Sequence, residues 1–454
     1  ENILNKIKII GDLYLIIYNY LSTTHKYILD IKGNTYHEDM LAKHDSDVMC
    51  HCITKNMAIR PDKMIKTFAK YGKLKNMIWL FNKNLVDRSE LTHEWTFANA
   101  AKYGDLKILK WLLKNNFKSD CDTFSYAAKN GDLENIKWLL KNGFVHDYAT
   151  FASAAENGNL DNMKWLLENN FEHNYYTFAF AAENGNLENM KWLLENNFEH
   201  DTRTFASAAK NGNLDNMKWL LENNFEHNYY TFAFAAENGN LENMKWLLEN
   251  NFEHDTRTFF SAAKNGNLDN MKWLLENNFK SDYNTFAAAA ENGNLDNMKW
   301  LLKNNFKHDS SVFAAAAKNG NLYNMKWLLE NNFEHNNDPY IFTCAAENGN
   351  LDNMKWLLKN NFKHDFFTFA YAAKNGNLEN MKWLLKNNFK YDSRTLNYAI
   401  ESNNLDNVKW LLENNFSYGE YAIKYLNNGN NPDIKKLLLK KKNCYHHNKL
   451  SFFF

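Results

Sequence analysis

The chain has few residues that interrupt helices, no excess charge of either sign and no apolar run long enough to cross a membrane. Only three prolines occur in 454 residues, which favours an all-helical protein because proline breaks helix interiors. Lysine plus arginine and aspartate plus glutamate number 53 each, so no overall field attracts nucleic acid or an acidic membrane surface. The longest apolar stretch, residues 9–21, contains Asp12 and is much shorter than a membrane span of about 20 residues. We therefore expect no nucleic-acid partner and no membrane partner.

The residues that carry chemistry are equally sparse. Five cysteines follow no pairing pattern, which is typical of a reducing compartment, so we expect a cytoplasmic protein. The sequence contains no phosphate-binding loop, no nucleophile elbow and no paired catalytic carboxylates. Cys50, His51 and Cys52 are too closely spaced for a zinc knuckle, and no second pair accompanies them. We expect no enzyme activity, no cofactor and no bound metal.

A tryptophan repeat dominates what remains. From Trp111 to Trp327, each tryptophan follows the last by 27 residues, and after a slip of two residues Trp356, Trp383 and Trp410 continue the series. A fixed period of this length indicates a repeat array, in which each unit contacts only its neighbours. Such a chain presents an extended surface rather than a pocket.

Residues 150–176 show how one unit begins. Thr150 is a candidate N-cap for a first helix, because its hydroxyl can accept a hydrogen bond from a free backbone N–H. On a helix that turns 100° per residue, Phe151 and Ala154 share one face, and we expect that face to be buried. Gly158 then stands where a left-handed residue ends a helix.

A second helix follows in the same unit. Asn159 is its predicted N-cap, and Met163 and Leu166 lie on its apolar arc. Asparagine is the residue type that best replaces glycine in the left-handed conformation that ends a helix. Asn170 is therefore the predicted end of the second helix. The predicted unit is therefore helix, tight turn, helix, loop.

The stretch AAENGNLDNMKWLLENN at residues 154–170 resembles the central part of an ankyrin repeat, and the match recurs from Gly72 to Trp410. This resemblance implies an all-α, ankyrin-type helical repeat solenoid of about 14 units. The period of 27 residues is shorter than the ~33 of the family, so the projecting hairpin loops must be shortened. Short, asparagine-rich arrays of this kind are similar to those of large DNA viruses of amoebae. The resemblance implies an intracellular, non-enzymatic protein-protein interaction scaffold, in the host cytoplasm if the protein is viral and engaged in virus-host interaction.

Three regions follow from these patterns: a helical N-terminal region at 1–63, the repeat solenoid at 64–440 and a C-terminal tail at 441–454. Residues 10–21 resemble the opening of an F-box, although Gly11 replaces the family's proline. An F-box would dock a Skp-type linker and a cullin ubiquitin ligase, with the repeats as substrate receptor. The alternative is an amphipathic helix that caps the first repeat. The sequence leaves both open.

Within the array, two positions vary while most do not. The residue twelve before each tryptophan changes from repeat to repeat, and the helical wheel predicts that it faces outward. The loop ahead of the first helix also varies, and it is rich in tyrosine, phenylalanine and arginine, which are frequent interface anchors. We expect a monomer that binds a protein partner on the concave surface. The candidate partner-binding residues are Tyr126, Tyr175, Tyr176, Phe180, Arg203, Tyr229, Tyr230, Phe234, Arg257, Tyr283, Phe366, Tyr371 and Tyr398.

A histidine recurs eight residues after the tryptophan in most repeats. Zinc ligands must lie within about 2.1 Å of one ion, whereas equivalent atoms in adjacent repeats are about 10 Å apart. We therefore interpret the column as structural. Its members are His146, His173, His200, His227, His254, His308, His335 and His364.

Overall fold

The computed structural model describes residues 61–85, 95–119, 122–336, 338–402, 404–417, 422, 424 and 434–440. Every regular element in these residues is an α-helix, so the predicted all-α class is confirmed. The twenty-six helices α5 to α30 alternate with turns and loops and form thirteen pairs. None of the helices in this described part is long and apolar enough to span a bilayer.

The helices fall into two compact units, residues 1–226 and 227–454. The first unit contains α5 (Pro61–Lys70), α6 (Leu74–Asn82), α7 (Trp95–Tyr103), α8 (Leu106–Lys114), α9 (Asp122–Asn130), α10 (Leu133–Lys141), α11 (Tyr148–Asn157), α12 (Leu160–Glu168), α13 (Tyr175–Asn184), α14 (Leu187–Glu195), α15 (Thr202–Asn211) and α16 (Leu214–Glu222). The second contains α17 (Tyr229–Asn238), α18 (Leu241–Glu249), α19 (Thr256–Asn265), α20 (Leu268–Glu276), α21 (Tyr283–Asn292), α22 (Leu295–Lys303), α23 (Ser311–Asn319), α24 (Leu322–Glu330), α25 (Pro339–Asn348), α26 (Leu351–Lys359), α27 (Phe366–Asn375), α28 (Leu378–Lys386), α29 (Ser393–Glu401) and α30 (Leu405–Glu413).

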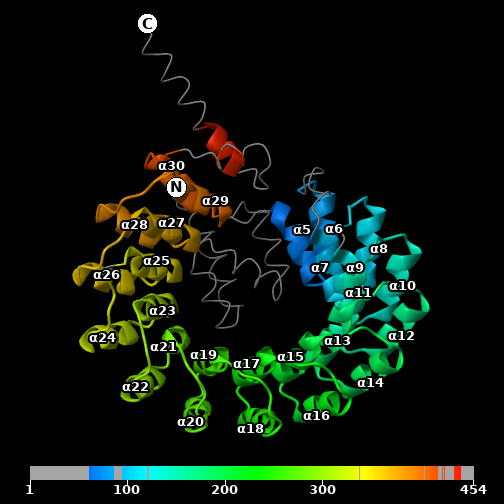
Figure 1. The fold of residues 1–454 in the computed structure, drawn as a ribbon. Coiled ribbons are helices and arrows are strands. Elements are labelled where there is room, and N and C mark those ends of the chain that lie inside the picture. Colours follow the sequence, from blue (N-terminus) through cyan, green and yellow to red (C-terminus); the bar gives the residue numbers. More distant parts are fainter. Residues whose placement is uncertain are drawn as a thin grey trace, which may run out of the picture. The chain divides into compact units, whose positions relative to one another are not determined.

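Within each unit the first helices and the second helices of the pairs form two rows. The odd-numbered helices lie along the inner side of the bend, and the even-numbered helices lie along the outer side (Figure 1). Consecutive odd-numbered helices contact each other most closely. The inner row therefore carries most of the contact between repeats, as expected for an array of nearest neighbours.

The helix boundaries follow from the caps, with one correction to the sequence prediction. The N-cap of α11 is Asp147, whose side chain accepts from the backbone N–H of Ala149 at 2.9 Å, whereas Thr150 lies inside the helix and is buried. Aspartate and asparagine are stronger N-caps than threonine. Because Asp147 caps α11, the Thr150 side chain can pack between repeats instead. Gly158 ends α11 at φ 84°, as predicted.

The second helix of the unit begins and ends where the sequence predicts. Asn159 caps α12 by accepting from the backbone N–H groups of Asp161 and Asn162 at 3.1 and 3.3 Å. Asn170 takes the left-handed conformation at φ 58°. The apolar arc of this helix is also confirmed, since Met163 and Leu166 are fully buried.

Several predictions fall on other parts of the chain. The F-box-like residues 10–21, the Cys50–Cys52 group and the C-terminal tail at 441–454 lie outside the described residues. The fourteenth repeat lies largely outside them as well, although residues 434–440 are helical and Lys436 is exposed.

Candidate partner-binding surface

Each odd-numbered helix buries one side and leaves one stripe partly open. In α13 the buried residues are Thr177, Phe178, Ala179, Ala181 and Ala182. The open stripe consists of its second, sixth and ninth residues, which share a face because they are four and three residues apart. We call the equivalent positions on all odd-numbered helices the first-helix face. On α13 these positions are Tyr176, Phe180 and Glu183.

None of the candidate residues predicted from the sequence is buried. Tyr176, Tyr230 and Tyr283 are 38%, 42% and 51% exposed, and Arg203 and Arg257 are exposed too. The other candidates, all half-buried, are Tyr126, Tyr175, Phe180, Tyr229, Phe234, Phe366, Tyr371 and Tyr398.

The middle row of the face, twelve residues before each tryptophan, does not open to solvent everywhere. Ser261, Ala288 and Cys344 are buried there, so the outward assignment is wrong at these three repeats. Burial also raises the pKa of the Cys344 thiol to about 11, which makes this cysteine a poor nucleophile.

Three arginines stack on aromatic pairs of the preceding repeat. The guanidinium of Arg203 in α15 lies 4.5 Å from the Tyr175 ring centroid and 4.8 Å from that of Tyr176, both in α13. The two tyrosine rings are themselves in contact, with centroids 4.6 Å apart. We call this group of three residues an aromatic pair–arginine cluster.

The second unit contains two more such clusters. Arg257 lies 4.4 and 4.8 Å from the ring centroids of Tyr229 and Tyr230. Arg394 lies 4.1 and 4.4 Å from those of Phe366 and Phe367. The geometry is the same for tyrosines and phenylalanines, so it depends on the rings rather than on the tyrosine hydroxyls.

The aspartate two residues earlier in the chain also contacts each of these arginines. Arg394 donates from Nε to Asp392 Oδ2 at 2.8 Å, and its terminal nitrogen lies 2.6 Å from the same oxygen. Asp392 also caps α29, accepting from the backbone N–H of Arg394 at 2.9 Å. The hydrogen bond to Asp392 raises the pKa of Arg394. In the Tyr229 cluster, a hydrogen bond with Arg257 lowers the pKa of the tyrosine.

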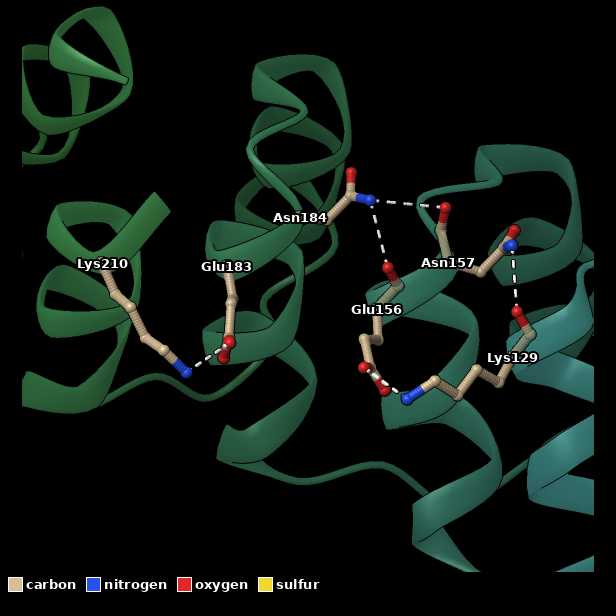
Figure 2. A network of polar contacts seen from close by, with 6 residues as sticks. All are labelled: Lys129, Glu156, Asn157, Glu183, Asn184 and Lys210. Carbon is tan, nitrogen blue, oxygen red and sulfur yellow. Dashed lines mark hydrogen bonds and ion pairs between the residues drawn. The ribbon is translucent and has the colours of Figure 1, made fainter. Parts of the chain in front are cut away.

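The third row of the face consists of lysine–glutamate pairs between neighbouring odd-numbered helices. Lys129 Nζ lies 2.6 Å from Glu156 Oε1, and Lys210 Nζ lies 2.7 Å from Glu183 Oε1 (Figure 2). In the second unit Lys318 pairs with Glu291 at 2.9 Å. Such exposed pairs contribute little to stability, but they neutralise the charge of this row.

Beside these pairs, asparagines connect one repeat to the next. Asn184 Nδ2 donates to the backbone oxygens of Glu156 and Asn157 at 3.1 and 3.4 Å (Figure 2). The adjacent glycine must lack a side chain, because a Cβ on Gly158 would lie 2.5 Å from Asn184 Oδ1. This turn therefore requires glycine both for its positive φ and for the approach of the next repeat.

A second, buried asparagine ladder joins the even-numbered helices to the preceding turn. Asn189 Nδ2 donates to the backbone oxygen of Gly158 at 2.7 Å, and Asn297 donates in the same way to Gly266 at 2.7 Å. Both asparagines are fully buried. Sequence reasoning used the asparagines only as caps and stops and missed these bonds. The signal was present as an asparagine three residues before almost every tryptophan.

The histidine column has the structural role that we predicted. Each ring lies against the loop phenylalanine of the next repeat, as in His173 on Phe198 at a centroid distance of 4.0 Å and His364 on Phe389 at 3.8 Å. Burial lowers the pKa of His173 below its usual value, and the nearby Glu199 opposes this more weakly. Tyr391 replaces histidine at the equivalent position and stacks on Phe416 at 4.0 Å.

Comparison with known proteins gives a family for most of the array. A model of ankyrin repeats in three copies matches in overlapping segments that extend from residue 97 to residue 449. No match is found among the curated proteins compared.

Solved structures similar to this chain include pentatricopeptide repeat proteins. The crystal structure of PPR10 from maize is 11% identical, and the match covers 95% of this chain and 87% of that chain with a TM-score of 0.31. PPR10 in complex with an 18-nt psaJ RNA element is 11% identical over 89% of this chain and 78% of that chain, with a TM-score of 0.27.

These structures require a correction. We expected no nucleic-acid partner from the balanced charge, but a helical repeat protein bound to RNA is among the similar structures, so that exclusion is withdrawn. At such TM-scores the likeness does not assign RNA to this chain either.

The paired helices, the glycine turns and the shared columns agree with the family match, which covers well over half of the sequence. The chain belongs to the ankyrin repeat family.

Proposed function

We propose that this protein is a non-enzymatic scaffold that binds a partner protein on its first-helix face. One observation carries the proposal: apart from Ser261, Ala288 and Cys344, the side chains that vary between repeats on this face are half-buried or exposed, whereas the buried phenylalanine and alanine columns barely change. A position that does not contribute to packing is free to contribute to binding. Aromatic and arginine side chains are the usual anchors of protein interfaces.

Three further expectations belong to this proposal. We propose that the protein acts as a monomer and that it is cytoplasmic, in the host cytoplasm if the array is viral. We also propose that the partner lies along the concave side of each unit, since the odd-numbered helices follow the inner side of the bend (Figure 1).

The test removes aromatic groups from the face without disturbing the buried columns. A variant with Tyr126→Ser, Phe180→Ser, Phe234→Ser and Tyr371→Ser should retain its far-ultraviolet circular dichroism, because all four side chains lie outside the buried core. Partners captured by the intact chain from cell extract should be depleted by about tenfold or more, as for interface hot spots.

The matched control is Tyr323→Ser. Tyr323 is 76% exposed but lies on the even-numbered helix α24, away from the first-helix face. It should leave capture unchanged. Equal capture by the fourfold variant and the intact chain would show that the partner binds elsewhere.

The F-box-like sequence supports a second candidate, a substrate-recognition subunit of a cullin ubiquitin ligase. Leu13, Ile16, Ile17 and Leu21 recur at helical spacing within it and would form the contact stripe. If so, the intact chain should co-purify with a recombinant Skp-type linker, and Leu13→Ser with Ile17→Ser should abolish this. If the linker does not bind, the N-terminal segment is better interpreted as a cap on the first repeat.

A further inference from the structure

The aromatic pair–arginine clusters differ from the rest of the first-helix face because their arginines are already fixed in position. Arg203, Arg257 and Arg394 each contact two rings on one side and an aspartate on another. A side chain held in this way loses little conformational freedom when a partner binds. The clusters are therefore preorganised contact points.

Their in-plane hydrogen-bonding capacity is partly taken. A carboxylate or phosphate binds arginine best through two parallel N–H bonds in the plane of the guanidinium. In Arg394, Nε and a terminal nitrogen both point at Asp392 Oδ2, at 2.8 and 2.6 Å. In Arg203 and Arg257, Nε faces Asp201 and Asp255 at 3.4 and 3.3 Å. An anionic ligand would have to displace these aspartates to bind the edge of the guanidinium that carries Nε.

A large part of each arginine side chain, in contrast, remains exposed to solvent. The side chains of Arg203, Arg257 and Arg394 are 49%, 46% and 42% exposed although each covers two rings. Flat guanidinium and ring surfaces attract other aromatic rings by cation–π and stacking interactions. The ligand group that best fits these clusters is therefore planar and uncharged.

The charged residues around the clusters also favour an uncharged ligand. On α13 and α15, Arg203 lies beside Asp201 and Lys210 pairs with Glu183. In the second unit Lys264 lies 3.9 Å from Glu237, and Lys374 lies 3.1 Å from Glu347. A face with its charges paired in this way selects a partner by stacking rather than by net charge.

We propose that each cluster binds an aromatic side chain from an uncharged segment of a partner protein. This inference rests on the proposed function, because it names the chemistry of the partner that the first-helix face takes. The expected segment carries tryptophan, tyrosine or phenylalanine and few charges. Its binding should depend weakly on salt, since no ion pair has to form.

The array itself supplies the conservative variant. Ser311 occupies the position of the arginine in α23, and its backbone N–H still donates to Asp309 at 2.9 Å. Arg203→Ser, Arg257→Ser and Arg394→Ser should therefore keep the hydrogen bond from this backbone N–H to the preceding aspartate while removing the stacked guanidinium. The charge-matched control replaces three exposed lysines of even-numbered helices: Lys191→Ser, Lys245→Ser and Lys409→Ser.

A random peptide library displayed on phage should be selected on the full-length chain. We expect the recovered peptides to be rich in aromatic residues and to bind the triple arginine variant about tenfold more weakly. The lysine control should bind them as the intact chain does. Affinity should change by less than about twofold between low and physiological salt.

Several outcomes would overturn the inference. Acidic peptides with steep salt dependence, equal binding to the arginine variant, or no enrichment on the intact chain would each do so. Binding of poly(U) RNA that is lost in the arginine variant would assign the clusters to nucleic acid instead. If peptides bind the arginine variant normally but fail on the fourfold aromatic-to-serine variant, the proposed function stands and only the cluster assignment fails.

Discussion

Two regions of the second unit share the same buried framework but present different side chains on the first-helix face. One region consists of helices α17 and α19, and the other consists of helices α21 and α23. Phe232 and Phe286 are both fully buried, and each contacts the loop phenylalanine of the next repeat at a centroid distance of 5.1 Å. On the first-helix face the two regions diverge. The positions of Tyr230, Phe234 and Arg257 in the first pair are occupied by Asn284, Ala288 and Ser311 in the second.

This difference shows that each odd-numbered helix has buried positions for stability and face positions for recognition. The buried columns fix the spacing of the repeats and tolerate little change, because each contributes to the contact with the next repeat. The face columns can lose a whole aromatic pair–arginine cluster while Phe286 and Phe313 beneath stay fully buried, although α23 begins one residue later in the repeat than α19. Stability and recognition are therefore assigned to different columns, and each assignment can be tested region by region.

The largest effect should come from the buried phenylalanines. Phe232→Ala and Phe286→Ala should each lower the free energy of unfolding by about 3–5 kcal/mol, since both remove a fully buried ring. Because the two environments match, the losses should agree within about 1 kcal/mol when measured by urea denaturation. A much larger loss in one region would mean that its face also contributes to stability.

The buried asparagine ladder should show an intermediate effect. Asn270 Nδ2 donates to the Gly239 oxygen and Asn324 Nδ2 to the Gly293 oxygen, both at 2.8 Å. Alanine at either position should cost about 1–3 kcal/mol, because it leaves a turn carbonyl without this donor. Urea denaturation measures the loss, and a cost near zero at both sites would contradict a structural role for the ladder.

Much of this framework could be predicted from sequence, because its causes are local. The stops at Gly158 and Asn170 follow from the left-handed conformation that each favours, and the burial of Phe151 follows from helical periodicity. Thr150 was mistaken for a cap because a threonine hydroxyl can also accept a hydrogen bond from a free backbone N–H, although aspartate does so more favourably. In the structure Asp147 takes this role, since its side chain accepts from the backbone N–H of Ala149.

The contacts between repeats were harder to predict, because they depend on which positions of two helices come together. The asparagine ladders and the stacked arginines join residues about one repeat apart, and no local rule specifies that distance. A clue was nevertheless present. Each of Arg203, Arg257 and Arg394 comes one repeat after an adjacent pair of aromatic residues.

A smaller effect should follow from acidification. Burial lowers the pKa of His227, His254 and His364 in the second unit, so the unfolded chain binds more protons near pH 6. The stability from the neutral rings is fully present above their unfolded pKa of about 6.5 and is lost as the pH falls below it. The urea midpoint should therefore be lower at about pH 5.5 than at about pH 7.5, which is still above the range where most carboxylates titrate.

Tyr391, which stacks on Phe416, supplies the control for this effect. Replacing His227, His254 and His364 by tyrosine should preserve the stacking and flatten the pH dependence of the midpoint. If the slope between these two pH values survives the replacement, other groups cause it.

The most direct test of the separation between columns is to transfer a face. Asn284→Tyr with Ser311→Arg would build an aromatic pair–arginine cluster on α21 and α23, since Tyr283 is already in place and both changed residues are exposed. The free energy of unfolding in urea should change by less than about 0.5 kcal/mol, as for surface substitutions away from special features. Calorimetric titration with an aromatic peptide selected on the intact chain should show one additional binding site. A loss of stability comparable to that of Asn270→Ala, or an unchanged number of sites, would contradict the assignment of folding and binding to separate columns.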